Sequence, residues 1–469
     1  MKSEIVRMSN FNVNYSTTIK LTGISLCLLA GESIGFLGLV HSGKDLLINI
    51  ICGNHEVDDT NFYIDGRNNL DSSEIQKLVY KITYSNYDID DWTVAEYICL
   101  VNNGSIFGLL KTKRLVKQAA EYIEKLKLKI DVNKKIKNLT ELEKRLVDLV
   151  KGYSRNVKIL VIEDEFEGCS TQDIEYFKEI LNRVMEEGMA AVINSHSDNV
   201  SYILSDKYVI FKKGRIVKKC SKDYIKDGSH LEEFLLSSST GLKKKDLDRD
   251  KAGMTAKKDI LYSIKGIILR GDQSITFDFY KGEVVTILAL DVKEKKRIFE
   301  LLSGRFIDRK TQIMLGQKNC NFYDITDFVK NKIVSAADMG GESELLLSMS
   351  VGNNLLMPSL EKIPALQHMF LQNKVVKMLE KEVNSQNKSV NVKDKSVNDN
   401  IILLLERWYI YNPKVLILFE PFIYCDVYGV SLIKSYIKKF TDLGTAVIIV
   451  KSREEYIEDI SDRIINIDI

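Results

Sequence analysis

The sequence predicts an α/β protein that contains two copies of one domain, each with a mainly parallel sheet flanked by helices. Short apolar runs such as Ile159 to Ile162 and Ala190 to Ile193 alternate with segments of helical spacing such as Thr171 to Glu187. This alternation is typical of a parallel sheet covered by helices. The second observation is an internal repeat, and the third is a glycine loop between an apolar run and a helical pattern.

The repeat consists of four segments that recur in the same order, at offsets of 251, 257, 256 and 256 residues. Collinear matches at nearly one offset indicate a duplicated domain. We therefore expect a first domain over 1–236, a polar linker over 237–258 and a second domain over 259–469. The matching pairs are GESIGFLGL at Gly31 with GEVVTILAL at Gly282, TVAEYICL at Thr93 with SVGNNLLM at Ser350, KILVIEDEFEGCS at Lys158 with KVLILFEPFIYCD at Lys414, and SDKYVIF at Ser205 with SDRIINI at Ser461.

The glycine loop lies in the stretch GESIGFLGLVHSGKDLLINIICG, which begins at Gly31. An apolar run precedes Gly38, and a helical pattern follows Gly43 and Lys44. The spacing matches G-x-x-x-x-G-K, the loop that wraps phosphate with its backbone N–H groups. The positive end of the following helix adds to anion binding. The sequence therefore predicts a phosphate site at this loop.

Asp45 departs from the motif, which ends in a Ser or Thr that ligates Mg²⁺. A carboxylate is a good Mg²⁺ ligand, but it also repels a triphosphate. Two interpretations stay open here: a working nucleotide loop with an unusual metal ligand, and a relic that keeps the turn without the ligand.

Composition restricts the function classes. The chain has 469 residues, 45% hydrophobic residues and a net charge of +2, so it lacks the basic excess that would indicate nucleic-acid binding. Its seven cysteines are scattered and contain no C-x-x-C pair, which favours free thiols in a reducing compartment. The polar N-terminus is no signal peptide, and the apolar runs are too short to span a membrane.

Strand signals vanish between Ser85 and Arg155, where two segments have helical spacing, EYIEKLKLKI and LEKRLVDLVKGY. We expect an inserted helical subdomain over about 86–156. A second polar, low-complexity run covers Lys381 to Asn400.

With these features, the chain resembles the ATP-binding subunit of bacterial ABC transporters. It is most similar to the tandem type that serves monosaccharide importers for ribose, galactose and xylose. The resemblance covers nearly the whole chain and implies two tandem ABC-type nucleotide-binding domains. Each would have a phosphate-loop parallel-sheet core, an antiparallel β piece and the inserted helical subdomain.

The resemblance implies the site residues of the first domain. Tyr15 would stack on adenine, and the loop residues Gly38, His41, Ser42, Gly43, Lys44 and Asp45 would bind ATP. Mg²⁺ would be held by Asp45 and Asp164, Glu165 would be the general base, and His196 would contact the γ-phosphate. Because Glu163 directly precedes the acidic pair, the register stays open by one residue. The alternative for this acidic segment is a solvated turn.

Other family motifs are degenerate. The Gln that senses Mg²⁺ falls at Ser85, and the LSGGQ signature falls at Leu139 to Glu143 without its glycines. In the second domain both loop glycines are gone, Phe419 replaces the Mg²⁺ aspartate, and Ser452 replaces the histidine. The second signature keeps Ser396 but has Val397 and Asn398 for its glycines.

Family members form two composite sites, so the two domains would pair within one chain. The resemblance leaves one half-site with its binding residues, and we expect weak ATP binding with slow or absent hydrolysis. Whether the chain is an active ABC-type ATPase stays open.

The implied partners are transmembrane permease subunits and, indirectly, a periplasmic or surface sugar-binding protein, with no nucleic acid. The segment after Ser85 would line the permease groove; there Trp92 is either a permease contact or a local core residue. The implied location is the cytoplasm, peripheral on the inner face of the cell membrane. Three functions stay open: an energising or scaffold subunit of a sugar importer, a catalytically dead regulator of a membrane complex, and an interaction protein that binds no nucleotide.

Overall fold

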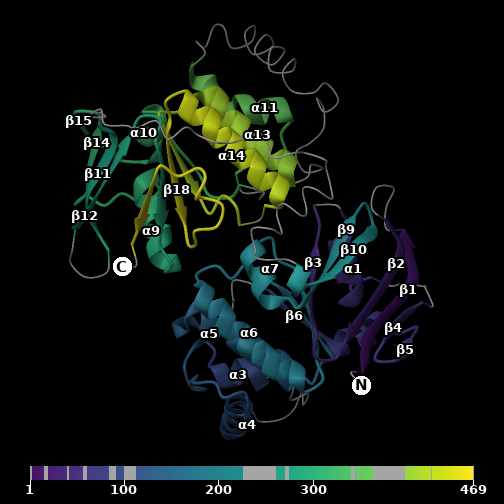
Figure 1. Ribbon diagram of the computed structural model, residues 1–469. Helices are drawn as coiled ribbons and strands as arrows, with labels where there is room; N and C mark the ends of the chain where they lie inside the picture. Colours follow the sequence, from purple (N-terminus) through teal and green to yellow (C-terminus); the bar gives the residue numbers. More distant parts are fainter. Residues whose placement is uncertain are drawn as a thin grey trace. The chain divides into compact units, whose positions relative to one another are not determined.

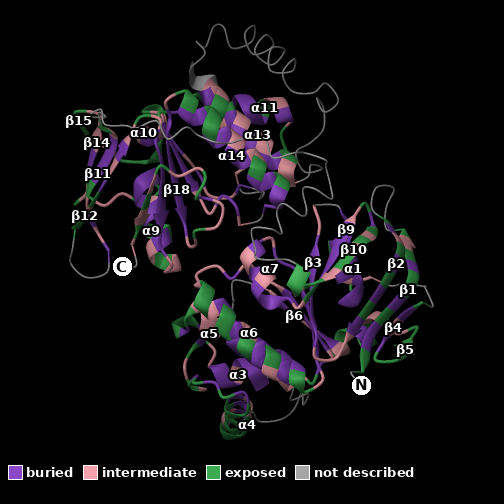
Figure 2. Ribbon diagram, in the orientation of Figure 1, coloured by how far each residue is buried: buried purple, intermediate pink, exposed green. Residues whose placement is uncertain are grey.

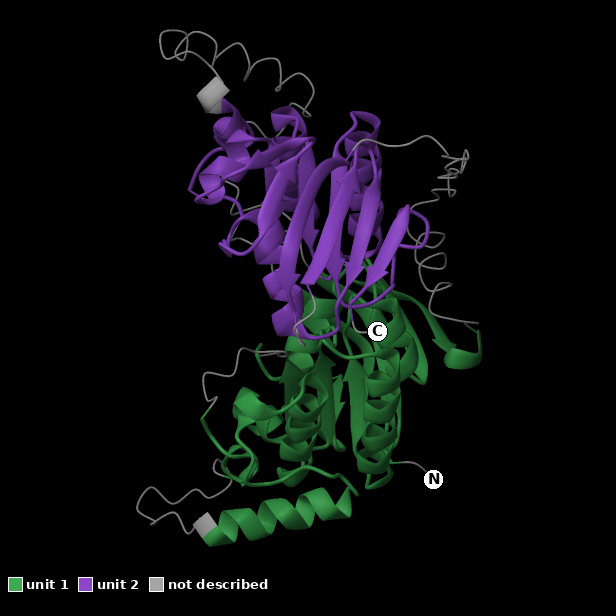
Figure 3. Ribbon diagram, turned by 90° about the vertical axis from the view of Figure 1, so that its left-hand side faces the viewer, with its two compact units in different colours: residues 1–243 green, residues 244–469 purple. Residues whose placement is uncertain are grey.

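The computed structural model describes residues 3–14, 20–39, 42–55, 61–83, 91–99, 112–224, 260–269, 274–339, 344–346, 348–362, 397–423 and 425–467. The chain divides into two compact units, Met1–Lys243 and Lys244–Ile469 (Figure 3). The expected linker at 237–258 lies outside the described residues, so its bounds stay a prediction. Within the described residues, no helix is both long enough and apolar enough to cross a membrane.

The first unit contains two sheets (Figure 1). An antiparallel sheet has the order β2-β1-β4-β5, and a six-stranded sheet has the order β10-β9-β3-β8-β7-β6. The pairs from β9 to β6 are parallel, and only β10 runs antiparallel to its neighbour. The strands are β1 (Glu4–Asn14), β2 (Lys20–Leu29), β3 (Ser33–Leu37), β4 (Phe62–Ile64), β5 (Arg67–Asn68), β6 (Val79–Thr83), β7 (Ile159–Glu163), β8 (Ala190–Ile193), β9 (Lys207–Lys212) and β10 (Arg215–Ser221).

The helices of the first unit cover the parallel sheet and form the inserted helical part. On α6 the buried side chains recur at helical spacing, and Figure 2 shows its exposed residues on the opposite face. Capping boxes start α2, α5 and α6, each with an Asp, Thr or Ser paired with an acid three residues on. The helices are α1 (Lys44–Ile51), α2 (Ser72–Leu78), α3 (Val94–Cys99), α4 (Thr112–Lys125), η2 (Ile136–Asn138), α5 (Glu141–Ser154), α6 (Thr171–Glu186), α7 (Asp198–Leu204) and η3 (Lys222–Tyr224).

The second unit repeats this architecture. Its antiparallel sheet has the order β12-β11-β14-β15, and its parallel sheet has the order β16-β17-β18-β13-β19. The strands are β11 (Ile260–Ile268), β12 (Ser274–Tyr280), β13 (Val284–Leu288), β14 (Gln312–Leu315), β15 (Lys318–Cys320), β16 (Ile333–Ala336), β17 (Val415–Phe419), β18 (Ala446–Lys451) and β19 (Arg463–Asn466). The helices are α9 (Val292–Ser303), α10 (Ile325–Lys330), α11 (Val351–Leu356), η4 (Met357–Lys362), α13 (Val397–Tyr411) and α14 (Val427–Asp442).

The two parallel sheets have the same strand order, because β9-β3-β8-β7-β6 corresponds to β19-β13-β18-β17-β16. Each sheet separates two apolar cores. Along β7, Ile159 and Val161 face one core and Leu160 and Ile162 the other, as the period of two in a strand requires. The residues of β17 alternate in the same way. The predicted α/β fold with two copies of one domain is confirmed.

Candidate functional site

The connection between β3 and α1 has a backbone that only glycines accept at two positions. Gly43 has φ +100°, and a Cβ there would lie 2.9 Å from the Leu21 side chain. A Cβ on Gly38 would lie 2.5 Å from Ser42 Oγ and 2.9 Å from the carbonyl oxygen of Phe211. The sequence pattern is thus explained by close backbone packing as well as by positive φ. Two of the predicted ligand residues, Tyr15 and His41, lie outside the described residues.

Lys44 is the first residue of α1, and its side chain is only 2% exposed. Its Nζ donates to Asn194 Oδ1 at 2.6 Å. The ammonium group has three donors, and this hydrogen bond is to a neutral amide. The amide itself does not neutralise the positive charge of Lys44 at the start of the helix.

The N-terminus of α1 has the features of an anion site. No side chain caps its first amides, and its N-cap residue is Gly43. Ser42 Oγ is buried and has no hydrogen-bond partner among the described residues. N–H groups without a side-chain cap, a buried hydroxyl and a lysine at one helix start together suit an anionic ligand.

Asp45 brings a negative charge to the same place. Its carboxylate oxygen lies 3.7 Å from Lys44 Nζ, and its side chain is 55% exposed. Asp45 Oδ1 also accepts from Asn194 Nδ2 at 3.4 Å. The carboxylate therefore partly neutralises Lys44 and remains open to solvent or to a cation.

Asn194 is a site residue that the sequence reasoning missed. It follows β8 directly, and its Nδ2 donates to Glu163 Oε1 at 2.8 Å, while Glu163 forms an ion pair with Lys81. The available signal was its place: carboxyl ends of parallel strands meet at one sheet edge, where ligands bind. An asparagine directly after a predicted apolar strand, two residues before His196, met that criterion.

Asp164, the predicted Mg²⁺ ligand, is paired with Arg145 of α5, and its role toward Mg²⁺ stays a prediction. Arg145 donates from Nε to Asp164 Oδ2 at 2.7 Å and from Nη2 to Oδ1 at 3.0 Å, and the N–H of Phe166 donates to Oδ1 at 2.6 Å. Both side chains are buried. Burial opposes the Arg145 charge, but the Asp164 carboxylate outweighs burial, and the pKa of Arg145 is raised.

The acidic strand end therefore presents a different carboxylate to Lys44 than expected. Glu163 is linked to Lys44 through Asn194, whereas the oxygens of Asp164 are engaged by Arg145. This corresponds to the one-residue shift that the sequence left open. Among the described residues, no group of three or more His, Cys, Asp or Glu side chains is arranged to hold a metal ion.

Glu165 accepts hydrogen bonds from the loop between β8 and α7. Ser195 Oγ donates to it at 2.6 Å, the N–H of His196 at 2.9 Å and the N–H of Ser197 at 2.9 Å. These contacts fix the backbone of half-buried His196. The observed contacts give Glu165 a structural part, and its role as a general base stays a prediction.

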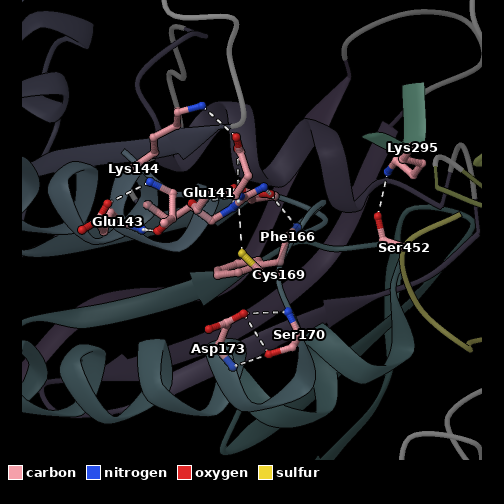
Figure 4. A network of polar contacts seen from close by, with 12 residues as sticks. Glu141, Glu143, Lys144, Phe166, Cys169, Ser170, Asp173, Lys295 and Ser452 are labelled. Carbon is pink, nitrogen blue, oxygen red and sulfur yellow. Dashed lines mark hydrogen bonds and ion pairs between the residues drawn. The ribbon is translucent and has the colours of Figure 1, made fainter. Parts of the chain in front are cut away.

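The LSGGQ-like segment begins α5 with a capping box instead of a glycine turn. Thr140 Oγ1 accepts from the N–H of Glu143 at 3.2 Å, and Glu143 accepts from the N–H of Thr140 at 2.8 Å and from Lys134 Nζ at 2.8 Å. Lys134 thus offsets the Glu143 charge. The polar contacts around Glu143 and at the α6 cap are drawn in Figure 4.

The second unit keeps a lysine at the matching position, because Lys295 follows Gly282 by as many residues as Lys44 follows Gly31. Its surroundings differ. Helix α9 already begins at Val292, the position of His41, and Asp291 caps it by accepting from the N–H groups of Lys293 and Glu294. The second unit thus has an additional helical turn where the first unit has its glycine loop. The Asp291 carboxylate caps the N-terminus of this helix.

Lys295 is fully buried, and its charge is neutralised within the unit. Its Nζ lies 2.5 Å from Glu420 Oε1. It also donates to Ser452 Oγ at 2.7 Å (Figure 4). Burial raises the pKa of Glu420, but Lys295 and Lys451 outweigh burial, and the pKa is lowered. Neither the lysine nor the helix start of this unit offers an open anion site.

Comparisons with known proteins agree with this architecture. The chain is 22% identical to the ribose import ATP-binding protein RbsA of Lacticaseibacillus paracasei over 98% of its own length and 92% of the relative. It is 25% identical to the arabinose import ATP-binding protein AraG of Mannheimia succiniciproducens over 99% of its length and 93% of the relative. No family model matches the chain.

Solved structures show the same fold. A model of ribosome-bound archaeal Pelota and ABCE1 matches 97% of this chain and 76% of that chain, with a TM-score of 0.61 and 15% identity. The complex of archaeal ribosomal stalk protein aP1 with the recycling factor aABCE1 matches 97% and 87%, with a TM-score of 0.56 and 15% identity. The fold of the chain is therefore similar to that of tandem ATP-binding-cassette proteins. Relatives that match nearly its whole length are named ribose and arabinose import ATP-binding proteins, which confirms the resemblance to the tandem sugar-importer type.

Proposed function

We propose that this chain is the ATP-binding subunit of an ABC-type sugar importer, with one nucleotide bound at the phosphate loop of its first unit. The relatives that match almost its whole length are named for ribose and arabinose import. The observation that carries the proposal is the uncapped start of α1, where Lys44 and Gly43 meet Ser42 Oγ, which has no hydrogen-bond partner among the described residues.

These residues fit a triphosphate. Gly38, Ser42, Gly43 and Lys44 would hold the phosphates; Tyr15 and His41, which lie outside the described residues, stay predicted ligands. Asp45 would ligate Mg²⁺ together with phosphate oxygens, since its carboxylate is half exposed. Among the described residues, the buried cation that it pairs with is Lys44. When bound, Mg²⁺ would offset the repulsion between Asp45 and the phosphates.

We expect hydrolysis to be weak or absent. A water-activating carboxylate must be available at the γ-phosphate, yet Asp164 is held by Arg145 and Glu165 by the loop around His196. The LSGGQ-like segment adds a helix cap where glycine amides would stabilise phosphate charge. Loss of such donors costs about 10²-fold or more in rate each.

The proposed partners are the permease subunits of the importer, with a sugar-binding protein acting through them. This places the protein in the cytoplasm, peripheral on the inner face of the cell membrane. Trp92 is half-buried next to η2, where its carbonyl oxygen accepts from the N–H of Ile136 at 2.9 Å. It stays a candidate permease contact.

A titration of purified protein with ATP and Mg²⁺ tests the proposal. We expect saturable binding that Lys44→Ala weakens by about tenfold or more, because hydrogen bonds to charged groups contribute about 1.5–3 kcal/mol. Lys129→Ala, at an exposed lysine of the same unit, is the matched control and should bind as the wild type does. Equal binding by the wild type and Lys44→Ala would refute the nucleotide site.

The second candidate function is a catalytically dead pseudo-ATPase that regulates or scaffolds a membrane complex. The internally neutralised Lys295 and the engaged Asp164 favour it. Sugar uptake in cells separates the two candidates. If Lys44→Ala abolishes uptake, nucleotide binding drives transport; if uptake persists with that variant but requires the chain, the scaffold function is supported.

A further inference from the structure

We propose that Arg145 is a positioning residue that keeps Lys44 available for phosphate, because it holds the Asp164 carboxylate that would otherwise neutralise the lysine. The inference rests on the proposed nucleotide site of the first unit. The supporting observation is a comparison of the two units. Both have a lysine at the helix start and a carboxylate at the strand end, but the carboxylate pairs with Arg145 in the first unit and with the lysine in the second.

The matching positions follow from the repeat. Lys44 and Lys295 are each thirteen residues after the first glycine of the repeated GE segment. Asp164 and Glu420 are each six residues after the lysine that begins the repeated strand segment, Lys158 or Lys414. Thirteen residues before that lysine, the first unit has Arg145 and the second has Ile401.

In the second unit, the strand-end carboxylate has no arginine. Ile401 is buried and apolar on α13. A buried carboxylate needs a cation or several donors, and Glu420 obtains Lys295 at 2.5 Å, together with the N–H and Oγ of Ser452 at 2.8 and 2.9 Å. Lys295, the lysine at the loop position, is therefore engaged by this carboxylate.

In the first unit, Arg145 provides the cation for the strand-end carboxylate. Asp164 receives two hydrogen bonds from Arg145 and one from the N–H of Phe166. Arg145 is held in place by further bonds from Nη1 to the carbonyl oxygen of Glu141 at 3.0 Å and to Cys169 Sγ at 3.6 Å. The buried Asp164 carboxylate therefore has a cation and three hydrogen bonds without Lys44.

The neighbouring carboxylate is also kept from Lys44. Glu163 is paired with Lys81 and accepts from Asn194, so that the neutral amide lies between Glu163 and the ammonium. Val450 stands at the position of Asn194 in the second unit. Arg145 and Asn194 thus distinguish a lysine that no strand-end carboxylate engages from one that is paired with such a carboxylate, and Arg145 is the residue whose loss frees a buried negative charge.

The test replaces Arg145 with the residue of the second unit, in the full chain, and uses two measurements. The first is the rate at which acetic anhydride acetylates Lys44 in ligand-free protein, followed by mass spectrometry of digests. An opposite charge favours the protonated amine, which is not nucleophilic. The second is the affinity for ATP with Mg²⁺, measured by calorimetry.

We expect Arg145→Ile to slow acetylation of Lys44 severalfold and to weaken ATP binding by about tenfold or more. Adding Asp164→Asn should restore both, because the freed negative charge is gone. Arg183→Ile, at an arginine whose Glu179 partner is exposed, is the matched control and should change neither. Unchanged acetylation and affinity in Arg145→Ile, or no recovery in the double variant, would overturn the proposal.

The acetylation measurement needs no nucleotide. If the wild type fails to bind ATP while Lys44 acetylation falls in Arg145→Ile and recovers in the double variant, the proposed function fails and the role of Arg145 stands. Should Arg145→Ile not fold, Glu420→Gln tests the same rule in the second unit. Acetylation of Lys295 should then rise severalfold, and an unchanged rate would contradict the rule.

Discussion

Asp45 changes the electrostatics of the phosphate loop more than any other single residue of the site. Its carboxylate lies 3.7 Å from the Lys44 ammonium, and Asn194 Nδ2 is 3.4 Å from it. At that separation a unit charge matters even at the surface, because two charges about 4 Å apart interact by about 1–4 kcal/mol. The loop is thus built to disfavour a bare triphosphate.

We predict that Asp45→Ser makes ATP bind about tenfold more tightly without Mg²⁺, since the serine removes the repulsion and restores a hydroxyl. The gain should shrink when Mg²⁺ is present, because the ion offsets Asp45 in the wild type. Calorimetric titrations with Mg²⁺ and with a chelator measure both. If the ATP affinity of Asp45→Ser depends on Mg²⁺ as strongly as that of the wild type, Asp45 does not face the phosphates.

Lys451 is a second residue whose charge has a measurable consequence. Burial lowers its pKa to about 8, although Glu420 and Glu455 oppose that shift. Between about pH 8 and pH 10.5 the unfolded lysine is protonated and the folded one is not. The unfolded state then binds more protons, so the free energy of unfolding of the second unit should rise with pH across this range.

We predict a rise of up to about 3 kcal/mol from this residue, and its loss in Lys451→Met. The chain has two tryptophans, Trp92 in the first unit and Trp408 in the second. Urea unfolding followed by Trp408 fluorescence in a Trp92→Phe background therefore reports the second unit. Lys438→Met, at an exposed lysine, is the control and should keep the rise in unfolding free energy with pH. If the rise is unchanged in Lys451→Met, it comes from the titration of another group.

At the scale of elements, the starts of α1 and α9 show how one position of a repeat gains or loses an anion site. Helix α1 starts after a glycine with φ +100° and has no side-chain cap. Helix α9 starts three positions earlier in the repeat and is capped by Asp291. A helix with its own carboxylate at the N-terminus has its first amides satisfied and its dipole offset.

We predict that Asp291→Ala destabilises the second unit by about 1 kcal/mol, the usual value of an N-cap. The same substitution should not create ATP binding there, because Lys295 stays paired with Glu420. Urea unfolding observed through Trp408, alongside a nucleotide titration, checks both parts. A second bound nucleotide in Asp291→Ala would show that the cap alone closes the site.

At the scale of the whole molecule, two units of the same topology differ in the state of one lysine. Lys44 donates to a neutral amide and has the exposed Asp45 carboxylate at 3.7 Å, whereas Lys295 is paired with the buried Glu420 carboxylate at 2.5 Å. Because a ligand stabilises only the unit that binds it, nucleotide should act on the two units unequally.

We predict that one ATP binds per chain and that it raises the unfolding midpoint reported by Trp92, in a Trp408→Phe background, but leaves the midpoint reported by Trp408 unchanged. Lys295→Ala should leave the stoichiometry at one, whereas Lys44→Ala should remove binding. Two nucleotides per chain in the wild type would contradict the assignment of the second unit.

The sequence by itself determined the fold, the duplication and the place of the glycine loop before α1. These depend on local patterns: the apolar runs, the helical spacing and the glycines Gly38 and Gly43 act within a few residues of each other. The predicted strands at 159–162 and 190–193 and the helix at 171–187 agree with β7, β8 and α6 to within one residue at each end.

Only the tertiary structure decided which charges meet. Lys44 and Asn194 are 150 residues apart in sequence, and Lys295 and Glu420 are 125 apart. Arg145 reaches Asp164 because α5 packs beside the end of β7, which no local pattern encodes. The charge that a ligand meets depends on all neighbours at short distance. A lysine at the same position of the repeat is therefore paired with a buried carboxylate in the second unit, whereas in the first unit its nearest carboxylate is the exposed Asp45.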